Sequence, residues 1–159
     1  MRKILLVLFC TATVISYAQT SDAEAQAIVN LLGVQKKEIV AKLVGVNPKD
    51  SAVFWKLYDE YQKKNMEVAK SRIHLYEKTA QAYSNMTPTV ADSLSQRFFD
   101  NRLAQEKSLQ EYYQKIKSAT NAITAFEFYQ AEVYILTQVR AQIMQQIPTY
   151  SEFVASRKK

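Results

Sequence analysis

The sequence predicts an all-α protein, an elongated bundle of about four long helices joined by short connections. Three observations lead to this prediction. The chain of 159 residues contains only two glycines and three prolines, so it lacks the tight turns that β-sandwiches and α/β enzymes need. Its apolar residues recur every three or four positions, which is the period of a helix face. With 48% hydrophobic and 23% charged residues, the composition is that of a folded chain.

The first eighteen residues have the three parts of a secretory signal peptide. Residues 1–3 include two basic side chains, residues 4–15 form an apolar run, and residues 16–18 place small side chains before a cleavage site. We therefore predict cleavage after Ala18. The run is shorter than the roughly 20 apolar residues that span a bilayer, and an uncleaved membrane anchor is the alternative. The lone Cys10 lies within this leader, so the mature chain is predicted to have no thiol.

Export without disulfides fits a bacterial envelope compartment, and the predicted location is therefore the periplasm. The formal charge is +6, and removal of Arg2 and Lys3 with the leader lowers it to +4. An exported chain with this modest basic excess is not expected to bind nucleic acid. The excess favours acidic polypeptides or anionic envelope surfaces instead. We expect residues 19–148 to form a single helical domain and residues 149–159 to form a polar, basic tail.

The first predicted helix covers about residues 23–44. Gly33 is expected to loosen it into two pieces. Gly45 is expected to end it, because glycine takes the left-handed conformation of a helix C-terminus at little cost. Apolar side chains and lysines mix along this segment. Packing on the bundle or across a dimer is the favoured interpretation, and contact with a membrane surface is the alternative.

Proline marks the start of the next two predicted helices, at residues 48–83 and 88–118. The residues of their N-terminal motifs are Asn47, Pro48, Asp50, Thr87 and Pro88. Asn and Thr are good N-caps, and a proline in the first helical position loses no intrahelical hydrogen bond. Polar or charged residues interrupt the apolar stripes of these helices at Asn65, Arg72, Arg102 and Gln105.

The fourth helix is predicted at residues 125–147, with Thr124 and Glu127 as a capping box. Its expected core stripe consists of Phe126, Tyr129, Val133, Leu136, Ile143 and Ile147. This segment carries the fewest charges, so we expect it to be the most buried helix or the one that forms a dimer. Residues 149–159 lose the stripe and are expected to form a solvated, frayed end.

The helix starts carry a resemblance to a known family. Residues 46–50 (VNPKD), 86–90 (MTPTV) and 123–127 (ITAFE) resemble the LTxxQ repeat of the Spy/CpxP-like periplasmic proteins, although none keeps the terminal Gln. Residues 54–61 (FWKLYDEY) are similar to an aromatic segment of related exported proteins from Bacteroidetes-type bacteria. The resemblance covers about residues 34–147. It implies an elongated, often dimeric, antiparallel four-helix cradle that holds unfolded proteins without ATP or senses envelope stress.

Catalytic and metal-binding residues are scarce. His74 is the only histidine, and Cys10 belongs to the predicted leader, so the ligands of a transition-metal site are missing. Serines and carboxylates have no histidine partner for nucleophilic catalysis. We therefore predict no catalytic residues, no metal and no cofactor, and an enzyme is the least favoured class.

Aromatic side chains interleaved with lysine and arginine suggest a surface for unfolded or partner proteins. The candidate residues are Trp55, Tyr58, Lys63, Lys64, Arg72, Tyr76, Phe99, Arg102 and Tyr113. An ordinary wide core stripe is the competing interpretation of the same aromatics. The leading functional hypothesis is a periplasmic, ATP-independent chaperone or stress-response protein. The alternatives are a regulatory partner of a membrane signalling protein and a structural module without a client.

Overall fold

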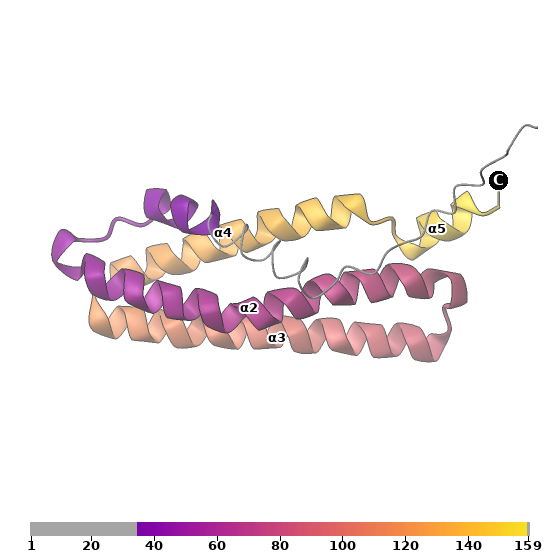
Figure 1. The fold of residues 1–159 in the computed structure, drawn as a ribbon, viewed down its shortest axis with the longest axis horizontal. Helices are drawn as coiled ribbons and strands as arrows, with labels where there is room; N and C mark the ends of the chain where they lie inside the picture. Colours follow the sequence, from indigo (N-terminus) through magenta and orange to yellow (C-terminus); the bar gives the residue numbers. More distant parts are fainter. Residues whose placement is uncertain (1–34, 159) are drawn as a thin grey trace, which may run out of the picture.

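A computed structural model of the protein describes the placement of residues 35–158 (Figure 1). Within these residues the fold is all-α and contains no strand, which confirms the predicted fold class. Residues 35–43 are helical. The elements that follow are η1 (Pro48–Asp50), α2 (Ser51–Ala82), η2 (Tyr83–Asn85), α3 (Pro88–Ala119), α4 (Ala122–Gln146) and α5 (Tyr150–Ser156). The predicted leader, Gly33 and the first part of the helix at 23–44 lie outside the described residues.

The long helices α2 and α3 form an antiparallel hairpin, and α4 returns along it (Figure 1). At 32 residues each, α2 and α3 are about 48 Å long. Their starts follow the local chemistry of the sequence. The Asn47 side chain accepts a hydrogen bond from the Lys49 N–H at 3.1 Å, and the Thr87 side chain accepts one from the Val90 N–H at 3.2 Å. Asp50 is the last residue of η1 and the N-cap of α2, and its side chain makes no capping hydrogen bond.

The start of α4 differs from the predicted capping box. Asn121 is the N-cap, and its side chain accepts from the N–H groups of Ile123 and Thr124 at 2.9 and 3.0 Å. Thr124 is buried in the first turn, and Glu127 accepts a hydrogen bond from the Gly45 N–H at 2.9 Å. The earlier start gives the helix a stronger cap than threonine and carries Thr124 and Ala125 into the core.

Gly45 does not take the predicted left-handed conformation, since no glycine among residues 35–158 has a positive φ. Its N–H is committed to Glu127 on α4 instead. A Cβ atom at this position would lie 3.5 and 3.8 Å from the two Glu127 carboxylate oxygens, which is ordinary contact. The link from residues 35–43 to α2 is therefore held by this long-range hydrogen bond rather than by a helix-terminating glycine.

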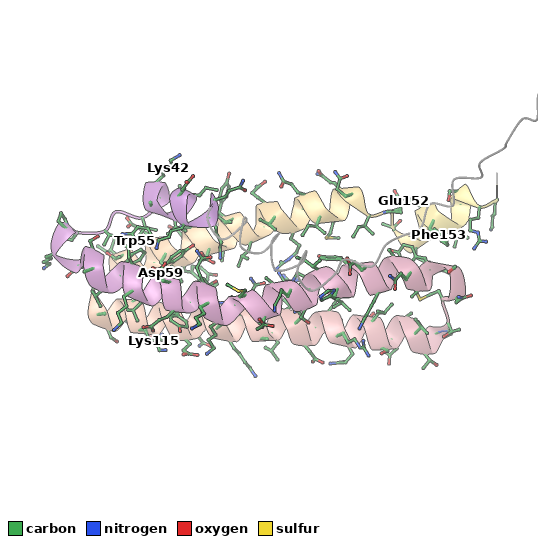
Figure 2. All side chains as sticks on the ribbon, in the orientation of Figure 1. Lys42, Trp55, Asp59, Lys115, Glu152 and Phe153 are labelled. Atoms are coloured by element: carbon green, nitrogen blue, oxygen red, sulfur yellow. The ribbon has the colours of Figure 1, made fainter. Side chains whose placement is uncertain are left out.

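The C-terminal residues are more ordered than a frayed tail. Thr149 and Glu152 form a reciprocal capping box at the start of α5. The Tyr83 hydroxyl donates to the Pro148 carbonyl at 2.9 Å, and its ring lies 5.4 Å from that of Phe153. Figure 2 labels Glu152 and Phe153 on this helix. A local cap and an aromatic contact with the end of α2 therefore order residues that lack a long apolar stripe.

The core is concentrated at one end of the molecule. It lies where residues 35–43, the first half of α2, the second half of α3 and the first half of α4 meet. Its buried apolar residues are Val40, Val44, Phe54, Tyr58, Tyr61, Leu109, Tyr112, Ile116, Ala125, Phe128, Ala131 and Ile135. Toward the other end, α4 rises away from α3 (Figure 1). The second half of α4 is consequently less covered than the first.

Candidate interaction surface

The described part of α4 is apolar on two faces, and the structure buries only one of them. The buried face contains Phe128, Ala131 and Ile135, together with the carboxylate of Glu132. The first half of the predicted core stripe is on the other face: Phe126, Tyr129 and Val133 are 51%, 42% and 38% exposed. The later members, Leu136, Ile143 and Ile147, are half-buried. The prediction that this stripe forms the core is therefore wrong for its first half.

The physical reason is that the hydrophobic pattern of α4 does not select a face. Packing selects the side with the small residues Ala125 and Ala131, because a small side chain lets neighbouring helices approach closely. It also selects the side on which Glu132 meets its hydrogen-bond partners. The larger apolar side chains are left facing outward along residues 123–134.

These outward side chains border a groove between α3 and α4. Its volume is about 370 Å³. Its lining consists of Glu106, Leu109, Gln110, Tyr113 and Gln114 from α3, and Phe126 and Tyr129 from α4. The lining is mostly aromatic, aliphatic or neutral, and Glu106 is its one charged residue. We call the groove and the exposed residues that border it the α3–α4 surface.

Exposed apolar residues extend this surface along both helices. On α3, Phe99 and Leu103 are exposed, and they share a helix face with Tyr113 through steps of three or four residues. On α4, Ile123 is exposed three residues before Phe126, and Val133 is exposed seven residues after it, so both share its helix face. Phe99 and Tyr113 are separated by about 21 Å of helix, and the polar side chains of Glu106 and Gln110 lie between Leu103 and Tyr113 on this face.

The structure does not bring the predicted candidate residues together on one face. Tyr58 is fully buried, so its assignment to a surface is wrong; α2 turns it into the core beside Phe54 and Phe128. Trp55 is half-buried, and the Lys37 ammonium lies 5.5 Å from its ring. Figure 2 labels Trp55 near the segment before α2.

The other candidates divide between three places. Lys63 and Lys64 are exposed on α2, where Lys64 pairs with Glu111 of α3 at 2.5 Å. Tyr76 is half-buried against Phe98, with ring centroids 5.3 Å apart. Arg102 is exposed on α3. Of the nine candidates, Phe99 and Tyr113 lie along the α3–α4 surface. Sequence reasoning missed Phe126 and Tyr129 as surface residues because it placed them in the core.

A buried polar network joins three segments at the core. Glu132 is fully buried and accepts hydrogen bonds from the hydroxyls of Tyr58 at 3.2 Å and Tyr61 at 2.7 Å. The Lys36 ammonium lies 2.5 Å from the same carboxylate. Burial, followed by the negative charge of Glu132, raises the pKa values of both tyrosines far above their ordinary value, so both hydroxyls remain protonated donors. The network fixes the position of residues 35–43, and of these side chains Lys36, which is 14% exposed, still reaches the surface.

A second polar contact runs between α2 and α3 and uses the residues that interrupt their stripes. Asn65 donates to the Ser108 hydroxyl at 3.0 Å. Arg72 donates to Asn101 at 2.8 Å and to Gln105 at 2.5 Å. Burial, followed by the charge of Arg140, lowers the pKa of Arg72. Two of the interrupting residues, Arg72 and Gln105, therefore pair with each other, and these bonds together with Asn65–Ser108 hold the two helices in register.

Ion pairs around Tyr112 give α2 and α3 a charged outer side. Glu111 pairs with Lys115 at 2.8 Å as well as with Lys64, and these two lysines lower its pKa to about 2. The Lys115 ammonium lies 4.4 Å from the Tyr112 ring centroid (Figure 2 labels Lys115). Glu111 thus forms ion pairs with both Lys64 and Lys115. Phe126 and Tyr129 on the α3–α4 surface are by contrast left exposed by residues 35–158.

Neither a metal centre nor a membrane span is found in the described residues. Over 35–158, no three His, Cys, Asp or Glu side chains gather as ligands of a metal ion. No helix in that range is long and apolar enough to cross a bilayer. In comparisons with known proteins, no family model, no curated protein and no solved structure matches this chain.

Proposed function

We propose that this chain is an exported polypeptide-binding protein that holds apolar segments of unfolded proteins on the α3–α4 surface. One observation carries the proposal: α4 has a second apolar face, and nothing in residues 35–158 covers it. A helix that is apolar on both sides is normally buried on both sides. A bound segment would cover the outer face and remove it from water.

The chemistry of the surface suits clients of varied sequence. Tyrosine and phenylalanine supply large contact areas with few rotatable bonds, and such residues dominate binding energy at protein interfaces. The polar lining consists mainly of the neutral amides Gln110 and Gln114, which accept or donate hydrogen bonds to any backbone. No charge pattern is imposed on the client, and no nucleotide is required.

The proposal includes the periplasmic location and the resemblance to Spy/CpxP-like proteins. The apolar leader at residues 1–18, with cleavage after Ala18, supports export. The scarcity of catalytic residues supports a binding role rather than an enzymatic one. Under this proposal the protein works in the envelope as a chaperone or stress-response component.

An aggregation assay tests the proposal. A chemically unfolded client is diluted into buffer with the purified protein, and light scattering is followed. The natural chain is expected to suppress scattering, and the double variant Phe126→Ser, Tyr129→Ser is expected to lose suppression. Tyr150→Ser is the matched control, because Tyr150 is an equally exposed aromatic on α5, away from the surface. Failure of the natural chain at several-fold excess, or full activity of the double variant, would contradict the proposal.

A crosslinking experiment separates this function from the regulatory alternative. A photoreactive amino acid at position 126 is introduced, and the envelope proteins joined to it are identified. Many different unfolded proteins are expected if the surface binds clients. A single membrane protein captured in stoichiometric amount would instead identify a regulatory partner of a signalling protein. A crosslinked dimer of this chain would show that the surface pairs two copies.

A further inference from the structure

A second groove lies between α2 and α4, separate from the α3–α4 surface. It has a volume of about 160 Å³ and is lined chiefly by apolar residues: Met66, Ala69 and Ile73 from α2, and Leu136, Val139 and Ile143 from α4. Gln35, Lys36 and Ile39 close one end of the groove. The groove therefore begins where the described chain begins.

The contacts of the first described segment fix its direction. The Lys36 ammonium lies 2.5 Å from Glu132 on α4 and 5.1 Å from the Tyr61 ring on α2. Further along the segment, Lys37 pairs with Asp59 on α2, and the Gly45 N–H donates to Glu127 on α4. As the chain runs from Lys36 to Gly45, its contacts therefore move toward the N-terminal ends of α2 and α4. Residues 35–43 are therefore antiparallel to α2 and α4, and their N-terminal end, Gln35, lies at the groove.

We propose that residues 23–34 of this chain occupy the groove as a helix that continues residues 35–43, antiparallel to α2 and α4. Lys36 lies beside Tyr61 and Glu132, and all three helices rise 1.5 Å per residue. Each residue before Lys36 is therefore at the same height as the residue equally far after Tyr61 and after Glu132. Leu32 then lies level with Leu136, and Val29 lies level with Val139. Leu32 and Val29 also share the helix face of Lys36, because they precede it by four and seven residues.

The length of the segment matches the length of the groove. Twelve helical residues extend about 18 Å. The α2 residues between Gln62 and Ile73, which mark the two ends of the lining, extend about 16 Å. The segment supplies the required side chains, since Ile28, Val29, Leu31 and Leu32 are all apolar. A filled groove would bury these residues and the lining together.

Charge and hydrogen bonding agree with the same occupant. Arg72 is half-buried at the far end of the groove. Burial lowers the pKa of Arg72, and among charged side chains Arg140 has the largest electrostatic effect, which lowers this pKa further. The proposed register brings Glu24 level with residues 73 and 144, one residue from Arg72 and about 6 Å along the helix axis from Arg140. Asn65 also lines the groove, and its buried Oδ1 has no hydrogen-bond partner among residues 35–158. A buried acceptor without a partner indicates that a neighbour is still to be placed there.

Covalent continuity favours this segment over a separate peptide. A tethered segment acts at an effective concentration on the order of mM, above that of a free competitor. The groove is therefore filled from within the chain, and the α3–α4 surface is left for clients. The proposal does not depend on the proposed function, because it concerns the other side of α4.

Crosslinking between engineered cysteines tests the register. Cys10 is replaced by alanine in every variant so that the introduced thiols are the only ones. Leu32→Cys is combined either with Leu136→Cys or, as the control, with Met144→Cys, which lies about 12 Å further along α4. A short bismaleimide is expected to join the first pair within a monomer and to leave the second pair unjoined. Equal yields for both pairs, or crosslinks only between molecules, would overturn the proposal.

Hydrogen exchange gives a second measurement that needs no cysteine. In the natural chain the amides of residues 24–34 are expected to exchange slowly. Leu32→Asp is expected to lose this protection and to speed exchange in α4 around Val139. Val34→Asp is the matched control, because Val34 lies two residues, or about 200°, from both Leu32 and Lys36 on a helix and so on the face opposite the groove. Fast exchange of residues 24–34 in the natural chain, or equal effects of both variants, would reject the occupied groove.

Discussion

Removal of the Glu132 carboxylate is the sharpest test of how the core is held together. Glu132 is fully buried, yet it has three partners: the hydroxyls of Tyr58 and Tyr61, and the Lys36 ammonium. The Lys36 side chain is only 14% exposed, so water compensates little when its partner is lost. Glu132→Ala would leave a buried cation and two buried hydroxyls without an acceptor, as well as a cavity.

The expected cost is about 3–5 kcal/mol, the range found when one partner of a buried ion pair is removed. Removal of a single tyrosine hydroxyl should cost less free energy of unfolding, and the shorter of the two hydrogen bonds to Glu132 should cost more than the longer one. Tyr61→Phe removes the 2.7 Å bond and is expected to cost more than Tyr58→Phe, which removes the 3.2 Å bond. A hydrogen bond to a charged group contributes about 1.5–3 kcal/mol, so Tyr61→Phe belongs in that range and Tyr58→Phe at or below its lower end.

Urea denaturation followed by tryptophan fluorescence measures these differences. Trp55 is the single tryptophan, and its ring packs against Phe54 at 5.0 Å, so its emission reports on this core. With a slope of about 2 kcal/mol per molar urea, Glu132→Ala should lower the midpoint by about 1.5–2.5 M. Glu67→Ala is the matched control. Its carboxylate is 75% exposed beside Lys70, and it is expected to cost no more than about 0.5 kcal/mol.

Two outcomes would refute this account of the core. One is a midpoint for Glu132→Ala as close to the natural value as that of Glu67→Ala. The other comes from the double variant Lys36→Met, Glu132→Met, which removes both charges together. Replacement of a buried pair by apolar side chains is often neutral or stabilising, so this variant should recover most of the stability. If it is no more stable than Glu132→Ala, Lys36 is not the partner whose burial makes the single change costly.

Three further predictions test local features of the fold. Gly45→Ala should leave the free energy of unfolding unchanged or raise it by up to about 1 kcal/mol in urea denaturation. The reason is that φ is not positive and the added Cβ meets Glu127 at ordinary contact distance. A loss of stability above about 1 kcal/mol would contradict this prediction. Asn121→Ala should destabilise by about 1 kcal/mol by the same measurement, and an unchanged midpoint would show that Asn121 is not the cap. The pKa of Glu152 is lowered by hydrogen bonds from Thr149, so its contribution to stability is complete above the ordinary pKa of 4.5 and is lost as pH falls through the lower folded pKa. The protection factors of the α5 amides, which correct for the intrinsic pH dependence of exchange, should fall over that acidic range, whereas Glu152→Gln should show no such fall.

Local chemistry explains which parts of the fold are predictable from sequence. At Asn47 and Thr87, a cap followed by proline fixes the helix start within a few residues, and the structure has both capping hydrogen bonds. The same rules misplace the start of α4, because Asn121 and Thr124 are both acceptable caps three residues apart. The choice between them depends on the burial of Thr124 and Ala125, which is a tertiary effect.

Long-range packing explains the features that the sequence does not predict. Tyr58 and Trp55 are both aromatic and lie three residues apart, and the contact with Phe128 decides that Tyr58 is the buried one. The α5 helix similarly needs the ring and hydroxyl of Tyr83, which is 67 residues before Tyr150 in the chain. Periodicity within a single helix carries no information about such contacts.

The outer face of α4 gives a prediction that separates binding from folding. Phe126 and Tyr129 are about half exposed, so each serine substitution should cost about 1 kcal/mol, roughly half the value of a fully buried aromatic. The double variant should therefore stay folded in urea denaturation while it loses client binding. A loss well above about 3 kcal/mol would show that these rings support the monomer, and the proposed surface would fail. A small loss would leave no reason within residues 35–158 for apolar side chains at these positions, and the reason must then lie in what covers them.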